Sequence, residues 1–97
     1  MMRKNIFICI LLLLFSISAW TQESVTVTGI VTDQNKEPLI GVNIAIENMP
    51  GLGVITDLNG RYKIKTSTYN KLVFSYIGYE TVNILVKEQR VINVVMK

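Results

Sequence analysis

Hydrophobic and polar residues alternate with a period of two along most of the chain after residue 24. This period indicates β-strands with one buried face, because successive side chains of a strand point to opposite sides of the sheet. Glycine, proline, asparagine and aspartate interrupt the alternation at short intervals, as they do in turns. The pattern predicts seven short strands, over residues 25–32, 42–46, 53–56, 61–65, 72–76, 82–86 and 91–96.

The spacing of these segments restricts the way in which they connect. No window after residue 24 has the period of an amphipathic helix, and the connections are too short for the helical crossover of a βαβ unit. Seven antiparallel strands with one apolar face each are expected to form an all-β sandwich of two sheets. Phe74 has apolar strands on both sides in the sequence and is the expected centre of the core, with Tyr62, Tyr76 and Tyr79 as further large packing side chains.

The first 21 residues have the composition of a targeting segment. Arg3 and Lys4 precede ten unbroken apolar residues, 6–15, and a stretch rich in small residues follows. This order is typical of a cleavable secretory signal peptide, and we expect cleavage after Ala19 or Thr21. An uncleaved membrane anchor is the less favoured alternative, because roughly 20 apolar residues are needed to cross a bilayer.

Acylation at Cys9 is also disfavoured, because this residue follows Ile8 and lies inside the apolar run. The expected organisation is a signal peptide, residues 1–21, followed by one small exported domain, residues 22–97. That mature chain would contain no cysteine and no transmembrane segment.

Composition narrows the function further. The chain has 10 Lys and Arg residues against 7 Asp and Glu residues, but Arg3 and Lys4 belong to the targeting segment. The remaining eight against seven give no reason to expect a nucleic-acid partner. The absence of histidine excludes an imidazole base and His-ligated zinc, and no pair of carboxylates stands out by its spacing. The sequence therefore predicts no catalytic, cofactor-binding or metal-binding residues, no cofactor, and no enzyme activity.

The segment Asp57-x-Asn59-Gly60 resembles the start of a calcium-binding loop. The later ligands and the terminal glutamate of such a loop are missing. A tight turn, in which the aspartate and asparagine bond to their own backbone, is the favoured interpretation.

Two groups of side chains could contact a partner. Arg61, Lys63 and Lys65 share one face of a predicted strand and could meet lipopolysaccharide phosphates or an acidic protein surface. A solvated face that discourages edge-to-edge aggregation is the favoured alternative. Tyr76 and Tyr79 could stack on a sugar ring, but their alternation with the core residues favours packing.

Several segments occur in the order and spacing of a known family, namely 29–33 (GIVTD), 37–44 (EPLIGVNI), Gly53, 56–62 (TDLNGRY) and 72–79 (LVFSYIGY). Together they resemble the carboxypeptidase-regulatory-like domain, a transthyretin-like sandwich of seven strands. This version is best known as the N-terminal extension of SusC/RagA-type TonB-dependent outer-membrane receptors. The resemblance covers residues 28–97 and departs from the family at residues 48–52, where a Lys-Gly-Thr-like stretch is usual.

The resemblance implies a non-catalytic accessory domain of a TonB-dependent nutrient receptor, exported to the periplasm or to the periplasmic side of the outer membrane. The implied partners are the plug and barrel of the receptor or the TonB machinery, with contact by strand addition at a sheet edge as one mechanism. Since the chain ends at Lys97, the expectation is a truncated or N-terminal portion of a receptor. The alternative is a stand-alone periplasmic or surface module that binds a protein or a glycan.

Overall fold

The structure is a computed structural model, and it describes residues 24–97. The predicted signal peptide, its cleavage site and Cys9 lie outside the described residues.

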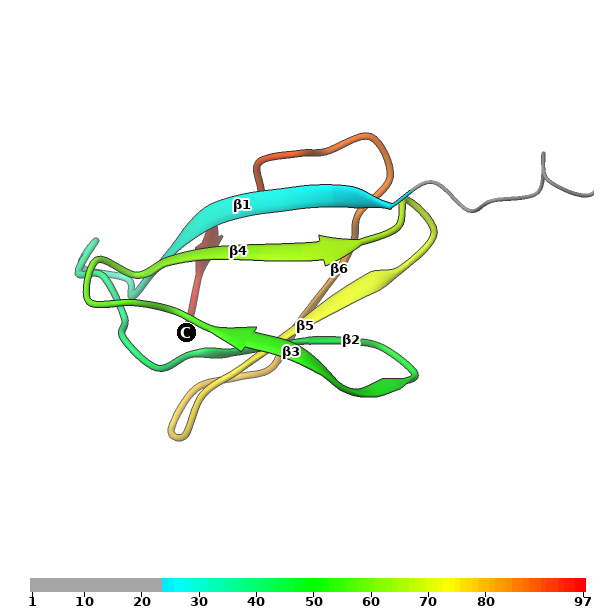
Figure 1. The fold of residues 1–97 in the computed structure, drawn as a ribbon. Helices are drawn as coiled ribbons and strands as arrows, with labels where there is room; N and C mark the ends of the chain where they lie inside the picture. Colours follow the sequence, from blue (N-terminus) through cyan, green and yellow to red (C-terminus); the bar gives the residue numbers. More distant parts are fainter. Residues whose placement is uncertain (1–23) are drawn as a thin grey trace, which may run out of the picture.

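Within residues 24–97 the chain forms two β-sheets that pack face to face (Figure 1). The strands are β1 (Val25–Thr32), β2 (Asn43–Ile46), β3 (Met49–Ile55), β4 (Arg61–Thr66), β5 (Lys71–Ser75), β6 (Val82–Leu85) and β7 (Val94–Val95). A three-stranded sheet has the order β4-β1-β7, and a four-stranded sheet has the order β3-β2-β5-β6. The predicted all-β sandwich of seven strands is confirmed.

One strand pairing differs from the antiparallel arrangement that we expected. β7 runs parallel to β1, with Val31 opposite Val94, whereas the other four pairings are antiparallel. After β6 the chain leaves the four-stranded sheet and crosses to the other layer, so that β7 arrives beside β1 in the same direction (Figure 1). The alternation of side chains is the same in both kinds of pairing, and it therefore carries no information on direction.

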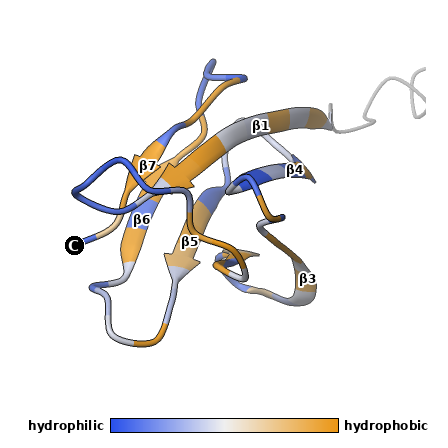
Figure 2. Ribbon diagram, turned by 90° about the vertical axis from the view of Figure 1, so that its left-hand side faces the viewer, coloured by the Kyte–Doolittle hydropathy of each residue, from blue (hydrophilic) through white to orange (hydrophobic). Residues whose placement is uncertain are grey.

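The core lies between the sheets and consists mainly of alternate apolar residues of β1, β2, β4 and β5, together with residues in and around β7. Phe74 is fully buried at its centre, as predicted, and its ring meets that of Tyr62 edge-on, with 5.5 Å between the ring centroids. Figure 2 shows hydrophobic stretches along β5, β6 and β7. The buried apolar residues are Val27, Val31, Val42, Ile44, Ile46, Tyr62, Ile64, Leu72, Phe74, Val86, Ile92, Val94 and Met96.

Two strands differ in length from the prediction by more than one residue. β3 begins at Met49 rather than at residue 53, because Asn48 and Gly51 take positive φ angles (64° and 87°) and the register shifts between Ala45 and Ile46. This bulge lets the strand continue through a segment without alternation. β7 is shorter than predicted, because the N–H of Ile30 donates a hydrogen bond to the side-chain oxygen of Asn93 at 2.9 Å instead of to a backbone carbonyl.

Tyr62 links β4 to the C-terminal segment. Its hydroxyl donates a hydrogen bond to the carbonyl oxygen of Ile92 at 2.5 Å, and the side chain is 5% exposed. Burial raises the pKa of Tyr62 from 10.0 to about 12, because the phenolate would lose its hydration. The neutral hydroxyl is therefore the form that the fold stabilises.

We expect Tyr62→Phe to lower the free energy of unfolding at neutral pH by about 1–2 kcal/mol, because a buried carbonyl loses its donor. The contribution of neutral Tyr62 is fully present below pH 10 and is lost as the pH rises from 10 through about 12. The stability gap between the two proteins should therefore narrow over that range. Urea unfolding at a series of pH values measures it, and a gap that stays constant up to pH 12 would contradict the assignment.

Candidate interaction surface

The described part of the chain contains no group of three or more His, Cys, Asp or Glu residues placed to hold a metal ion. Within the same residues, no helix has the length and apolar character to cross a membrane. The features that could contact a partner are turns, sheet edges and the solvent-facing sides of the two sheets.

The turn between β3 and β4 is built around the carboxylate of Asp57. Its Oδ1 accepts hydrogen bonds from the backbone N–H groups of Asn59 at 2.9 Å and Arg61 at 3.0 Å. The carbonyl of Asp57 accepts the N–H of Gly60 at 2.9 Å, and Gly60 has a φ of 71°. The predicted turn is confirmed, with one oxygen of the Asp57 carboxylate capping its own backbone.

A second turn of the same design, not recognised as such from the sequence, joins β1 to the segment before β2. Asp33 Oδ1 accepts the N–H groups of Asn35 at 2.8 Å and Glu37 at 3.0 Å. Val31 links the two turns, because its N–H donates a hydrogen bond to the carbonyl oxygen of Gly60 at 2.8 Å. The signal was present as the repeat Thr-Asp-x-Asn, at residues 32–35 and 56–59.

Removal of the capping carboxylate tests the turn assignment. We expect Asp57→Ala to cost about 1 kcal/mol of stability, because two backbone donors lose their acceptor, whereas Asp57→Asn keeps an oxygen and should cost less. Thermal unfolding with and without added calcium measures both points. A calcium-dependent rise in the melting temperature that disappears in Asp57→Ala would revive the calcium interpretation.

The basic residues of β4 lie on the solvent side of the three-stranded sheet, as predicted. Arg61, Lys63 and Lys65 are all exposed, and the last two stand opposite Thr28 and Thr26 of β1. β4 is the end strand of its sheet in the order β4-β1-β7. Lysines at such an edge oppose pairing with another β-sheet.

The other edge strand on this side of the molecule, β3, has the opposite character. It contains no charged residue, and six of its seven residues are exposed. Leu52 is 57% exposed and Ile55 is 67% exposed. A groove of about 590 Å³ follows the whole strand and extends over β2 to Asn43 and Ala45. Figure 1 shows β3 and β4 running across the front of the sandwich, one in each layer.

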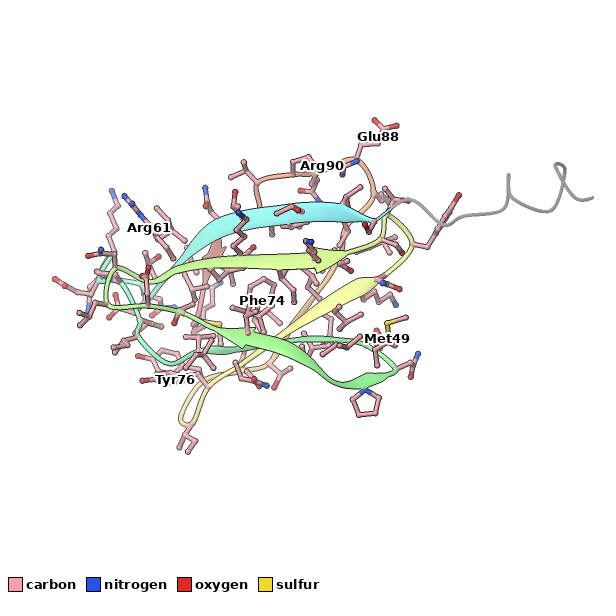
Figure 3. The ribbon with its side chains drawn as sticks, viewed as in Figure 1. Met49, Arg61, Phe74, Tyr76, Glu88 and Arg90 are labelled. Atoms are coloured by element: carbon pink, nitrogen blue, oxygen red, sulfur yellow. The ribbon has the colours of Figure 1, made fainter. Side chains whose placement is uncertain are left out.

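A smaller depression of about 230 Å³ lies between these two edge strands. Met49 and Leu52 of β3 line it on one side, and Lys65 and Thr66 of β4 on the other. In Figure 3 the label of Met49 marks the end of β3 at which this depression opens, and Phe74 lies between the layers. This flank therefore combines apolar side chains with a basic one.

The tyrosines proposed as a sugar platform pack against the protein itself. Tyr76 and Tyr79 are partly buried against the core, with 5.7 Å between their ring centroids. The packing interpretation is confirmed. Sequence reasoning missed Ile77, which is 98% exposed beside Tyr76 in a groove of about 430 Å³.

These features define a small β-sandwich module whose distinctive chemistry lies on strand edges. The chain belongs to the CarboxypepD_reg-like domain family, whose profile matches residues 27–97. The resemblance inferred from the sequence motifs is thereby confirmed.

Two curated relatives are TonB-dependent receptors. The receptor SusC of Bacteroides thetaiotaomicron is 34% identical over 102 aligned positions, which cover 100% of this chain and 10% of SusC. A TonB-dependent receptor of Formosa agariphila is 37% identical over 93 positions, covering 91% of this chain and 9% of that receptor. The chain thus spans about a tenth of the length of these relatives, and it is homologous to one segment of them.

A solved structure shares the fold at low sequence identity. The 3-chlorocatechol 1,2-dioxygenase of Rhodococcus opacus 1CP superposes with a TM-score of 0.52 at 17% identity, covering 66% of this chain and 43% of the dioxygenase. At that identity the similarity concerns the fold alone.

Proposed function

We propose that this protein is a non-catalytic interaction domain of a TonB-dependent, SusC/RagA-like receptor system. The observation that carries the proposal is the match of the whole chain to a segment of SusC at 34% identity. The partners in this proposal are the receptor's plug and barrel or the TonB machinery, and the location is the periplasm or the periplasmic side of the outer membrane.

The surface supports a role in binding rather than in catalysis. Among the described residues, Asp57 and Asp33 use a carboxylate oxygen to cap backbone N–H groups. The two sheets leave β3 and β4 as edge strands on one flank, and edge strands offer backbone donors and acceptors to another polypeptide. A scaffold that exposes such edges is suited to protein–protein contact.

Export through a cleaved signal peptide, residues 1–21, is part of the proposal. Mass spectrometry of the product from the source organism would identify its first residue. We expect cleavage after Ala19 or Thr21, which leaves the domain of residues 22–97 intact. A product that retains residues 6–15 would support a membrane anchor in place of the cleaved signal.

The size and location of the native product test the receptor assignment. An antibody against residues 25–97 would be applied to separated periplasmic and outer-membrane fractions of the source organism. The proposal predicts an outer-membrane signal, either in a band many times larger than the domain or in a band of domain size that co-purifies with a receptor. A domain-sized band found free in the periplasm, with no receptor bound, would favour the stand-alone binding module.

A further inference from the structure

We propose that the free edge of β3 is a strand-addition site for an extended polypeptide segment in which apolar and acidic residues alternate. The inference deepens the proposed function, on which it rests, by naming the surface and the kind of segment that binds. Four observations carry it: the orientation of the backbone, the absence of charge, the adjoining groove and the basic neighbour.

The backbone of β3 presents unused hydrogen-bonding groups on its outer edge. Within the described residues β3 has one hydrogen-bonded neighbour, β2, with Ile44 opposite Val54. The N–H of Thr56 donates to the carbonyl of Val42 at 3.1 Å, which fixes the phase of the antiparallel pattern. Because bonded and non-bonded pairs alternate, the N–H and C=O groups of Gly53 and Ile55 point away from β2. They are free to pair with an added strand.

From Gly53 to Ile55 the edge lacks the devices that normally prevent such pairing, because the proline and the bulge of β3 lie before Gly53. Edge strands are usually blunted by charged side chains, above all lysine, as β4 is by Lys63 and Lys65. β3 has no charged residue, and its one proline, Pro50, lies near its start, away from Gly53 and Ile55. Gly51 and Gly53 lack side chains that could cover the edge, and the groove of about 590 Å³ leaves room along the whole strand.

The surroundings of the edge determine the chemistry of the segment. Side chains of an added strand that face β4 would enter the depression lined by Met49, Leu52 and Lys65. In an alternating segment the acidic residues would occupy this face, where their methylene groups would cover Met49 and Leu52 and a carboxylate would pair with Lys65. Glu47 and Asp57 lie in the turns at the two ends of β3, so the acidic residues of the segment should fall between them. The apolar side chains of the alternate residues would lie on the other face, over Ala45 and Ile55.

The test uses the purified chain labelled with ¹⁵N and a short capped peptide of alternating valine and glutamate. We expect the amide resonances of Gly53 and Ile55 to shift and their hydrogen exchange to slow on addition of this peptide. A peptide of alternating valine and lysine is the control and should bind at least about tenfold more weakly, because its lysines are repelled by Lys65 and the other basic residues of β4. Peptide binding in solution is independent of the native product's size and location, so the failure of one proposal is distinguishable from failure of the other.

Two pairs of variants locate the site. Ile55→Pro removes an outward N–H at a position where an edge strand tolerates proline, whereas Ile55→Val keeps that donor. We expect the first to weaken binding of the acidic peptide about tenfold, the effect of roughly one hydrogen bond, and the second to leave it unchanged. Should Ile55→Pro fail to fold, Leu52→Glu and Leu52→Lys replace it, with binding expected to fall in the glutamate variant and to persist in the lysine variant.

Three results would overturn the proposal. The first is shifts that occur elsewhere while the amides of Gly53 and Ile55 remain unchanged. The second is equal binding by Ile55→Pro and Ile55→Val. The third is a shift of the same two amides in the chain alone as its concentration rises, which would identify a second copy of this chain as the occupant of the edge.

Discussion

Gly29→Ala is expected to lower the free energy of unfolding by at least about 3 kcal/mol. A Cβ at this position would lie 1.9 Å from the carbonyl oxygen of Ile92 and 2.9 Å from Cε1 of Tyr62. The first neighbour is backbone, so the C-terminal segment would have to move away from β1. That movement breaks the hydrogen bond that Ile92 receives from Tyr62, and overpacking and the loss of a buried hydrogen bond each cost about 1–3 kcal/mol.

The measurement compares the urea unfolding of Gly29→Ala with that of Gly51→Ala, monitored by far-ultraviolet circular dichroism. A Cβ at Gly51 would have no heavy atom within 4 Å outside its own chain neighbours, but the φ of Gly51 is 87°. The control should therefore lose only about 1–2 kcal/mol, from backbone strain. Equal unfolding midpoints for the two variants would show that the close approach of Ile92 to β1 is wrong.

Gly29 also shows what a one-dimensional pattern leaves out. In the sequence it occupies one position of an alternating strand, between Thr28 and Ile30. A residue without a side chain is required there because of Ile92, which is 63 residues away, and because of the ring of Tyr62, which lies opposite Gly29 in the register. The alternation predicted the strand, whereas the reason for a glycine within it depends on the packing of distant segments.

The alternation of apolar and polar residues predicted a strand correctly wherever one face of that strand is buried and the other is solvated. In β4, Tyr62, Ile64 and Thr66 are buried, and the intervening basic residues are exposed. A shift of one residue in register would reverse every side chain, so the pattern specifies such strands strongly. The same condition holds for Leu72 and Phe74 in β5.

The alternation failed at the start of β3, which supplies the candidate binding edge. Residues 49–53 are all exposed, so neither face carries a burial signal. The sequence showed only a break at Asn48-Met49-Pro50-Gly51 and a departure from the family pattern there. The missing charge along residues 48–56 was visible, but its meaning depends on β3 being the end strand of its sheet, which is a property of topology.

Phe74→Ala is expected to destabilise the domain by about 3–5 kcal/mol, the usual cost of truncating a fully buried aromatic residue. Phe74 has no exposed surface, and it contacts Tyr62 across the two sheets in an edge-to-face arrangement. The cavity would open between β5 and β4, where both layers depend on the same ring. A domain of this size has about 5–15 kcal/mol of stability in total, and therefore the variant should be largely unfolded under conditions in which the parent protein is folded.

Tyr69→Ala is the matched control, because it removes a ring of similar size that is 90% exposed. Its free energy of unfolding, measured with urea, should stay within about 0.5 kcal/mol of that of the parent protein, as for most surface substitutions. A midpoint for Phe74→Ala close to that of Tyr69→Ala would mean that the two sheets do not share this core. Such a result would also remove the basis for treating β3 and β4 as the two edges of one flank, since their positions in the sandwich depend on the packing of the layers around Phe74.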